Sequence, residues 1–336
     1  MTYAQIVDGL TRPDVQDLFA EADRVRREQV GDAVHLRGLI EFSNVCGRDC
    51  FYCGLRRSNR SVERYSMSID EIYETAANAE RLGYKSLVLQ SGESASYPVA
   101  DVCRLLERIK RELKVAVTLS MGEKTREEYA SLKAAGADRY LLRFETSSSR
   151  LFAELKPDSS FDERMQCLLW LKELGFQVGS GIMVGLPGQT PEMVADDIML
   201  MKILDLDMIG IGPFIPNPQT PLEGAASGTL DMTLRAVALI RLVTRNTHIP
   251  ATTAMGSIDK QGRQRALRCG ANVLMPNVTP TRYREHYQLY PGKICIQDKP
   301  ADCALCISGM VASLGRSIAQ DAGHSLKRVT REPSAS

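Results

Sequence analysis

The regular alternation of short apolar runs with longer amphipathic segments is the feature that most constrains the fold of this chain. Runs rich in apolar and β-branched residues predict strands at residues 36–42, 86–89, 115–119, 140–144, 178–184, 208–211, 249–253 and 272–275. Helical spacing predicts helices at residues 69–82, 99–113, 126–135, 161–174, 193–204, 233–243 and 260–268. Strict alternation of this kind favours a parallel sheet whose strands are connected by helices.

Eight predicted strands that alternate with helices predict an α/β fold in which a single (βα)8 TIM barrel forms the main domain. A doubly wound open sheet is the alternative, because periodicity does not distinguish a closed sheet from an open one. No linker or repeat divides the 336 residues. We expect an N-terminal helical preface over residues 1–35 with a helix at 15–29, the barrel over 36–290, and a C-terminal extension over 291–336. The tail from His324 onwards is polar and expected to fray.

Composition and charge indicate what kind of partner this chain binds and in which compartment it acts. Lys+Arg 42 against Asp+Glu 41 gives a net charge of +1, whereas a nucleic-acid binder usually carries a basic excess or stripe. The richest apolar window, residues 199–216, is interrupted by charges and is no membrane span. The N-terminal residues lack the features of a signal peptide. We therefore expect a cytoplasmic protein with a small-molecule substrate and without nucleic-acid or membrane binding. Nine cysteines there suggest metal binding or catalysis rather than disulfides.

The carboxyl ends of the predicted strands are polar, and in a barrel this is the end that carries the chemistry. The polar residues at these ends are Ser43, Asn44, Gln90, Ser91, Glu93, Thr118, Ser120, Arg143, Glu145, Thr252, Thr253 and Asn277. Each of them alone could be the cap of the following helix. A whole ring of polar ends is harder to explain by capping and predicts a site.

A cysteine cluster follows the first predicted strand directly. Cys46, Cys50 and Cys53 have the spacing Cys-x3-Cys-x2-Cys. Structural zinc normally takes four protein ligands, and no histidine stands near this loop in the sequence. Three thiolates on a [4Fe-4S] cube would leave one iron open for a further ligand. The alternative interpretations are a zinc loop or three packing cysteines.

The cluster, with an aromatic residue before its last cysteine, resembles that of radical S-adenosylmethionine (SAM) enzymes. The resemblance implies a [4Fe-4S] cluster whose open iron binds the amino and carboxylate groups of SAM. It also implies reductive cleavage of the sulfonium C–S bond to a 5′-deoxyadenosyl radical. Cluster reduction potentials extend low enough for such a step.

Two further motifs agree with this resemblance. Gln90-Ser91-Gly92-Glu93 resembles the Gly-Gly-Glu element that holds the amino group of SAM, although Ser91 replaces one glycine. The turn that begins at Gly185 resembles the turn that packs on the adenine. Either segment alone could be an ordinary turn.

Longer stretches narrow the resemblance to the HydE family of [FeFe]-hydrogenase maturases, within the biotin-synthase-like group. These stretches are residues 40–46, 89–93, 183–190, 209–216, 249–256 and 287–293, and the likeness runs from about Leu36 to Leu314. It implies a role in building the hydrogenase diiron subcluster, H-cluster assembly, from a cysteine-bearing iron carbonyl cyanide complex. The implied partners are a partner maturase that delivers the substrate, a scaffold maturase that accepts the product, and an electron donor such as ferredoxin or flavodoxin.

The resemblance also implies contacts for individual residues. Cofactor contacts carried over to this sequence are Tyr52, Gln90, Glu93, Glu145, Arg164, Gly185, Met208 and Tyr287. The hydroxyl groups and the guanidinium at strand ends suit a small anionic substrate; these belong to Ser91, Thr118, Arg143, Thr252 and Thr253. An ion pair between Arg143 and Glu145, or a surface position for Arg164, are the plainer alternatives.

The sequence departs from the family pattern at two positions. Phe144 stands where a histidine is expected, and strand alternation predicts that it faces away from the site. Val278 stands where an aromatic residue is expected, which changes the wall of the expected substrate site.

A second triad, Cys295, Cys303 and Cys306, lies near the C-terminus with the spacing Cys-x7-Cys-x2-Cys. It resembles an auxiliary site of the maturase family that varies among members, and it could hold a second [2Fe-2S] or [4Fe-4S] cluster. Zinc or an empty surface loop are the alternatives. Cys103, Cys167 and Cys269 are expected to pack in the core.

Other functions remain open from the sequence alone. Methylornithine synthase is the first alternative, and we expect it to lack the second triad. A biotin-synthase-like enzyme would place further cluster ligands inside the barrel. A non-catalytic iron–sulfur or zinc carrier would not need the polar ring of strand ends.

Overall fold

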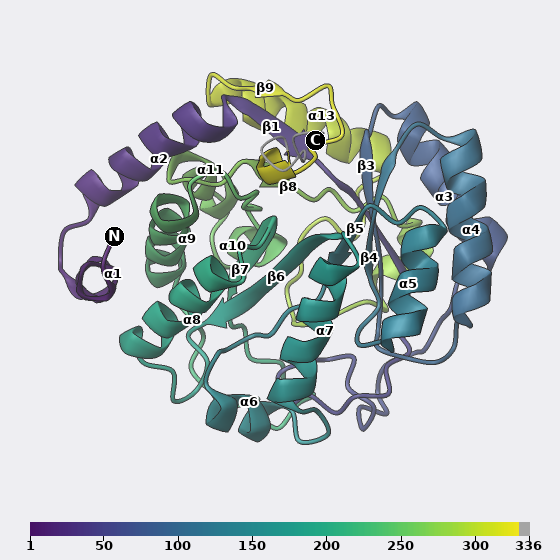
Figure 1. The fold of residues 1–336 in the computed structure, drawn as a ribbon, viewed down its shortest axis with the longest axis horizontal. Helices are drawn as coiled ribbons and strands as arrows, with labels where there is room; N and C mark the ends of the chain where they lie inside the picture. Colours follow the sequence, from purple (N-terminus) through teal and green to yellow (C-terminus); the bar gives the residue numbers. More distant parts are fainter. Residues whose placement is uncertain (329–336) are drawn as a thin grey trace, which may run out of the picture.

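The computed structural model describes residues 1–328 and shows a parallel β-sheet surrounded by helices (Figure 1). Six strands pair side by side in the order of the chain, and every pairing is parallel. They are β2 (Gly38–Ser43), β3 (Ser86–Ser91), β4 (Ala116–Ser120), β5 (Arg139–Leu141), β6 (Gln177–Val184) and β7 (Met208–Pro213). The predicted parallel α/β fold is therefore confirmed.

Helices connect these strands and cover the outer face of the sheet (Figure 1). They are α3 (Ile69–Arg81), α4 (Val99–Glu112), α5 (Arg126–Ala134), α6 (Ser149–Leu155), α7 (Phe161–Glu173), α8 (Pro191–Ile203) and α9 (Leu230–Thr244). Local sequence explains where they begin, since Ser68 and Thr125 form capping boxes with Glu71 and Glu128. The short helix α6 falls where the sequence predicted no element.

A second sheet has the order β8-β1-β9, with β1 (Ala33–Leu36), β8 (Val273–Leu274) and β9 (Ser317–Ile318). The strand predicted at residues 36–42 thus begins earlier and contributes to both sheets. The strand predicted at 249–253 contains only isolated bridges, of which Ile211–Ala251 and Pro250–Val273 are two. It is cut short because α10 (Thr253–Ile258) begins at its last residue; α11 (Gly262–Arg268) follows.

Backbone contacts also link the two sheets beyond their regular strands. Ile209 N donates to His248 O at 2.9 Å, Ala251 N to Val273 O at 2.9 Å, and Leu39 N to Pro276 O at 2.8 Å. Residues 248–251 and the segment around β8 therefore lie between β7 and β2.

The two ends of the chain differ from the prediction. The N-terminal preface holds two helices, α1 (Tyr3–Thr11) and α2 (Gln16–Val30), where one was predicted. The short helix α12 (Thr281–Arg284) lies within the predicted barrel region, and the C-terminal extension contains α13 (Pro300–Ser313) and a 3-10 helix, η1 (Leu326–Arg328).

The expected fraying does not begin at His324. The Gln177 side chain bonds both His324 Nδ1, at 2.8 Å, and Ser325 N, at 2.9 Å. The Lys327 ammonium lies 2.7 Å from an Asp205 carboxylate oxygen. The rest of the predicted tail, 329–336, lies outside the described residues.

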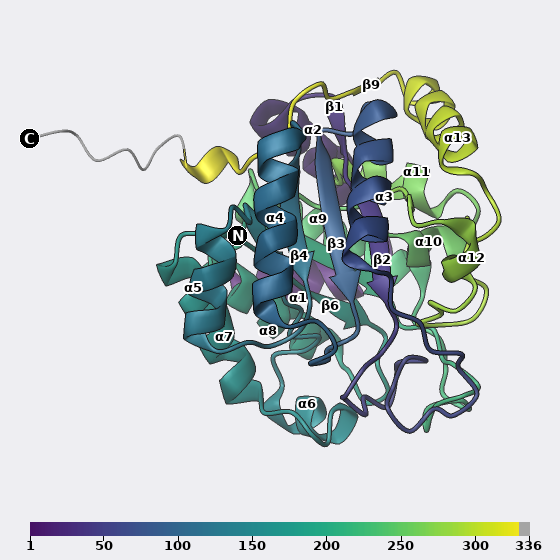
Figure 2. The ribbon, with the colours of Figure 1, turned by 90° about the vertical axis from the view of Figure 1, so that its right-hand side faces the viewer.

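The strands place their two ends in different surroundings (Figure 2). The arrowheads of β2 and β3 point to the end where α6 and the long loops gather, whereas β1, β9 and α13 lie towards the opposite end. None of the helices within residues 1–328 is long and apolar enough to cross a membrane. The loops at the carboxyl ends of the strands are where the predicted site residues gather.

Candidate active site

The loop that carries Cys46, Cys50 and Cys53 leaves β2 at its carboxyl end and is fixed by backbone hydrogen bonds from three other segments. Gly47 N donates to Glu93 O at 2.7 Å, Phe51 N to Leu155 O at 2.9 Å, and Gly54 N to Leu289 O at 2.9 Å. The loop is thus attached to the end of β3, to the end of α6 and to the chain after α12. Its conformation depends on residues far apart in the sequence.

The three cysteines of this loop are free thiols, with Cys50 buried and the other two half-buried. Burial raises the pKa of the Cys53 thiol, and the charges of Cys50 and Cys46 act in the same direction. Burial also raises the pKa of Cys50, while the ammonium of Lys156 opposes that rise. The mutual electrostatic effects indicate that the sulfur atoms lie close to one another and to a buried cation. A raised pKa keeps a metal-free thiol protonated, and coordination to a metal cluster would hold the three sulfur atoms as thiolates.

Two glycines allow close packing next to this loop. A Cβ atom on Gly92 would lie 2.3 Å from Val45 O. Gly122 has φ +75°, and a Cβ there would lie 2.0 Å from Glu93 Cγ. Gly92 therefore lets the end of β3 meet the cysteine loop, and Gly122 leaves room for the Glu93 side chain.

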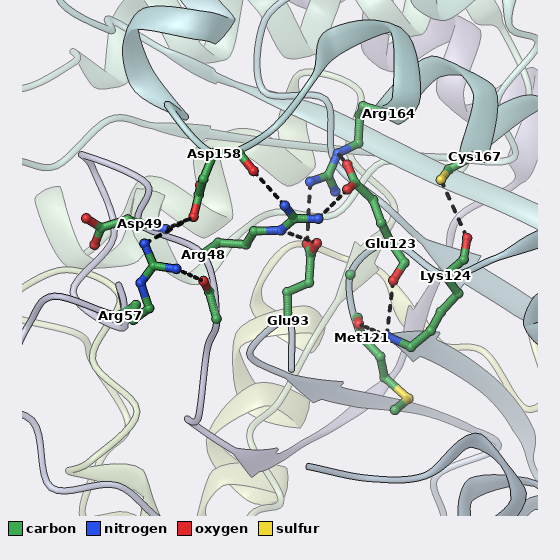
Figure 3. A network of polar contacts seen from close by, with 12 residues as sticks. Arg48, Asp49, Arg57, Glu93, Met121, Glu123, Lys124, Asp158, Arg164 and Cys167 are labelled. Carbon is green, nitrogen blue, oxygen red and sulfur yellow. Dashed lines mark hydrogen bonds and ion pairs between the residues drawn. The ribbon is translucent and has the colours of Figure 1, made fainter. Parts of the chain in front are cut away.

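A network of two arginines and two glutamates lies beside the loop (Figure 3). Arg48 Nε is 2.5 Å from Glu93 Oε1, and Arg48 Nη2 is 2.6 Å from Glu123 Oε2. Arg164 Nη2 is 3.4 Å from Glu93 Oε2, and Arg164 Nε is 2.8 Å from Glu123 Oε1. Burial raises the pKa of Glu93, but the Arg164 and Arg48 guanidinium groups outweigh it and lower the pKa. Glu93 is thus held as a carboxylate.

The two arginines of the network differ in how fully their N–H groups are used. Arg48 donates to Glu93, to Glu123 and, at 2.6 Å, to Asp158 O. Among the described residues the Arg164 side chain makes a single hydrogen bond, the long one to Glu93, although only 3% of the residue's surface is exposed. Its Nε lies near Glu123 without hydrogen-bond geometry. A buried guanidinium with unused donors fits a carboxylate-bearing ligand such as SAM.

Arg143 and Glu145 form an ion pair at the end of β5. The Glu145 Oε2 atom lies 3.0 Å from Arg143 Nε and 2.9 Å from Nη2. Arg143 also donates to Ile182 O at 2.6 Å. Glu145 has φ +67°, a backbone conformation that is costly for a residue with a side chain and that clusters at functional sites. The plain ion pair considered from the sequence is therefore present.

Three further residues predicted to contact SAM are Gln90, Tyr287 and Tyr52. Gln90 Nε2 donates to the hydroxyl of the buried Tyr287 at 3.2 Å. Tyr52 packs against the apolar cluster of Leu151, Leu155, Leu186 and Phe214.

The turn at Gly185 is built around a side-chain amide. Gly185 has φ +85°, and its N–H donates to Gln189 Oε1 at 2.7 Å. The amide nitrogen of Gln189 in turn lies 3.5 Å from a carboxylate oxygen of Asp197 on α8. Asp197 is a supporting residue that the sequence analysis missed.

Met208 is predicted to contact the cofactor, and this contact stays a prediction. It is the first residue of β7, so it lies at the amino end of the strand, and its sulfur is 2.8 Å from Arg37 Nη1. The buried Thr118, in the middle of β4, lines the same cavity as Met208 and Arg37, and its hydroxyl has no hydrogen-bond partner among the described residues.

The remaining residues predicted to bind substrate lie at strand ends. The Thr252 hydroxyl donates to Ile211 O at 2.9 Å, and Ser91 Oγ donates to Gly92 O at 2.8 Å. Thr253 is the first residue of α10 and is half-buried.

The second triad is less enclosed than the first. Cys303 and Cys306 lie on α13, where Cys303 is buried and Cys306 is exposed. Cys295 has φ +64°, and a hydrogen bond with Cys303 lowers its pKa to about 7. Within residues 1–328, no three His, Cys, Asp or Glu side chains are grouped so as to hold a single metal ion.

The other cysteines and the two substituted positions lie in the interior. Cys167 and Cys269 belong to the core and Cys103 packs against it, as predicted. Phe144 and Val278 are buried in the same core.

This chain is similar in sequence to several known proteins. Residues 40–201 match the model of the Radical SAM superfamily. The "[FeFe] hydrogenase maturase subunit HydE" of Thermotoga maritima is 53% identical over 91% of this chain and 88% of its own length. A 3-methylornithine synthase of Methanosarcina acetivorans is 29% identical over 78% of this chain and 74% of its own length.

Solved structures agree on the fold. A crystal structure of methylornithine synthase (PylB) has a TM-score of 0.84 at 24% identity and covers 95% of this chain and 94% of that chain. A crystal structure of HydG has a TM-score of 0.80 at 19% identity, with coverage of 94% and 72%.

The cysteine loop and the superfamily match define the chain as a radical SAM enzyme, a class that uses a [4Fe-4S] cluster and SAM. Within that class the likeness to the Thermotoga protein extends over nearly the whole chain. The chain belongs to the HydE family.

Proposed function

We propose that this chain acts in the maturation of [FeFe]-hydrogenase. The observation that carries the proposal is the 53% identity to a hydrogenase maturase over 91% of the chain. The cysteine loop, the Arg48–Glu93–Glu123–Arg164 network and the Gly185 turn supply a site of the kind that this activity needs.

The parallel strands form a closed (βα)8 barrel in this proposal. The hydrogen bonds from Ile209 to His248, from Ala251 to Val273 and from Leu39 to Pro276 support it, because they join β7 to β2 through two further segments. A closed barrel with eight strands is filled by side chains and places its active site at the carboxyl end. Closure would also keep water away from a reactive species.

Each group of residues has a separate task in this proposal. Cys46, Cys50 and Cys53 hold the cluster, and Arg164 and Glu93 bind the carboxylate and amino groups of SAM. The cluster and SAM together supply the reductive cleavage of the sulfonium and a 5′-deoxyadenosyl radical. Tyr52, Tyr287 and the Gly185 turn orient the nucleoside, and Glu145 completes the contacts to the methionine part.

The proposed substrate is a small anionic sulfur-containing molecule, a cysteine-bearing iron carbonyl cyanide complex. Arg143 supplies a guanidinium close to the site, and Ser91, Thr252 and Thr253 supply polar groups at the carboxyl ends of the strands. The hydroxyl of Thr118 is a further donor inside the sheet. These groups suit an anion with several hydrogen-bond acceptors.

The proposal includes partners and a compartment. A partner maturase would deliver the substrate, a scaffold maturase would take the product, and a ferredoxin or flavodoxin would supply electrons in the cytoplasm. The Cys295–Cys303–Cys306 region would hold a second iron–sulfur cluster that is not needed for SAM cleavage.

Anaerobic reconstitution tests the function directly. The protein should bind about four iron atoms at the first triad and release 5′-deoxyadenosine from SAM after reduction. Added to the other maturases and the apo-hydrogenase, it should restore hydrogen production, and Cys50→Ala should not. Reductive SAM cleavage without any rescue of hydrogenase would reject the maturase function and leave another radical reaction.

A further inference from the structure

Glu123 lies in the loop after β4 and connects the cysteine loop to the arginine that faces the proposed ligand (Figure 3). Its two carboxylate oxygens point to different arginines, with Oε2 2.6 Å from Arg48 Nη2 and Oε1 2.8 Å from Arg164 Nε. Only 10% of its side chain is exposed. The position of the Glu123 carboxylate is therefore determined by its contacts with the two arginines.

The two contacts of Glu123 have different geometry. The contact with Arg48 is a short hydrogen bond, and each of the three guanidinium nitrogens of Arg48 donates to one acceptor. The contact with Arg164 is an ion pair in which the N–H does not point at the oxygen. Arg48 therefore fixes Glu123, and Glu123 attracts Arg164 while leaving donors of Arg164 free for another acceptor.

The charges around Cys50 are not balanced without a ligand. Arg48, Arg164 and the buried Lys156 lie around Glu93 and Glu123. Glu145 also acts on Lys156, but it is paired with Arg143. Among these side chains the cations outnumber the carboxylates by one. A ligand carboxylate beside Arg164 would supply the missing negative charge.

We propose that Glu123 is a positioning residue that orients the Arg164 guanidinium towards the carboxylate of SAM. This inference rests on the proposed function, because it takes SAM as the ligand. Glu123 itself touches no ligand. It acts through Arg164. Because Arg48 of the cysteine loop also binds Glu123, Glu123 fixes the position of Arg164 relative to that loop.

Ligand binding to the anaerobically reconstituted holoprotein tests this role. The ligands are SAM and 5′-methylthioadenosine, which keeps the nucleoside and the sulfur but has no amino-acid carboxylate. Glu123→Gln keeps the size of the side chain and removes its charge. We expect it to weaken SAM binding about tenfold and to change methylthioadenosine binding by less than about twofold. Glu74→Gln, at an exposed position of α3, is the matched control and should bind both ligands like the parent.

Two further variants separate positioning from a general loss of structure. In an Arg164→Gln background, adding Glu123→Gln should cause no further loss of SAM affinity, because both act through one group. Glu123→Asp keeps the charge and should recover part of the affinity that Glu123→Gln loses. Iron content, measured on every variant, shows whether the cluster is retained.

The outcomes distinguish this inference from the proposed function. Three results would each overturn the positioning role. Glu123→Gln could bind SAM as tightly as the parent, or it could lose the same affinity for SAM and for methylthioadenosine. Glu123→Asp could bind SAM no more tightly than Glu123→Gln. If Glu123→Gln does not retain iron, the comparison of Glu123→Asp with the parent on the two ligands decides. A parent holoprotein that binds no SAM at all would instead reject the proposed function.

Discussion

The two cysteine triads of this chain look alike in sequence and differ in the structure around them. Cys46, Cys50 and Cys53 lie on a loop attached to three other segments, next to buried cations and carboxylates. The second triad joins a turn residue with positive φ to one buried and one exposed position on α13. α13 lies towards the end of the fold opposite the loops at the carboxyl ends of the strands (Figure 2).

This difference indicates that spacing between cysteines defines what can bind, and the surrounding charges define what can react. Fixed charges and dipoles placed in advance stabilise charge that develops during a reaction. The first triad has such surroundings in Arg48, Arg164, Glu93 and Glu123. Near the second triad, Arg284 donates to the carbonyls of Cys295 and Asp298. The first region is therefore expected to respond strongly to substitution and the second weakly.

The largest expected effect is that of Cys50→Ala. Removal of one of three thiolates should abolish reductive SAM cleavage and lower the iron bound at the first triad. Iron analysis and the yield of 5′-deoxyadenosine after reduction measure both. Production of 5′-deoxyadenosine at the parent rate would show that the first triad is not the site of the reaction and would remove the contrast between the two regions.

Gly122→Ala should have the next largest effect. The new Cβ would lie 2.0 Å from Glu93 Cγ, and the backbone at φ +75° already disfavours any side chain. Glu93 must move, so we expect SAM affinity to fall by about tenfold or more, about 1.4 kcal/mol. Binding of SAM to the reconstituted protein measures it. Gly83→Ala has a similar backbone conformation, φ +93°, with open space around it, and should leave SAM affinity unchanged.

The alternation of strands and helices was enough to predict the parallel α/β fold, because each apolar run is buried on the sheet. The prediction failed where tertiary contacts outweighed local pattern. The run at 249–253 reads as a strand, yet Thr252 is the N-cap of α10 and only isolated bridges form before it. The helix α1 was missed because it is short and its two buried apolar side chains, Ile6 and Leu10, belong to a helix that packs against α8 and α9.

Candidate site residues that belong to a sequence motif could be predicted. Residues that join the site only through an ion pair were missed. The cysteines, Glu93 and Arg164 were found through the resemblance, and the structure places Glu93 and Arg164 within one network. Glu123 was missed, although an acidic residue soon after a strand end was a signal that could have found it. The cofactor contact of Met208 was implied by the resemblance alone, which did not indicate that Met208 lies at the amino end of β7.

Lys293→Met tests the connection between the two regions. Lys293 stands two residues before Cys295 in the sequence. Its ammonium pairs with the buried Glu41 and also donates to Tyr287 O at 3.2 Å. Removing the cation leaves Glu41 buried with only Asn277 as a side-chain partner among the described residues. We expect a loss of about 3–5 kcal/mol in the free energy of unfolding, measured with denaturant.

The double variant Glu41→Gln/Lys293→Met is the control for that loss. It removes both charges and should recover much of the stability. A single variant as stable as the parent would indicate that the second region is not fixed to the first through this pair.

A smaller effect is expected from pH, through the support of the Gly185 turn. Burial raises the pKa of Asp197 from its ordinary 3.8 to about 7. The unfolded chain releases this proton near pH 4 and the folded protein only near pH 7, so stability should fall as pH rises between these values and stay level above. Unfolding free energies measured from pH 5 to pH 8 should show this fall in the parent.

Asp197→Asn removes the titrating group and should flatten that part of the pH profile. The neighbouring Glu145 and Asp196 also raise the pKa of Asp197, so their own titration remains in the variant. An unchanged profile in Asp197→Asn would assign the pH dependence to other groups and weaken the view that the first region is the sensitive one.

The smallest effects are expected at the second triad. Small effects there would most clearly distinguish it from the first triad. Cys306 is exposed and has no hydrogen bond among the described residues, so Cys306→Ala should change the free energy of unfolding by less than about 0.5 kcal/mol. Cys303 is buried in the core, and Cys303→Ala should cost about 1 kcal/mol of stability. Both variants should still release 5′-deoxyadenosine at close to the parent rate, because neither touches the network beside Cys50. A strong loss of SAM cleavage in Cys303→Ala with the first cluster intact would mean that the two triads work together, and the comparison between them would have to be redrawn as a single extended site.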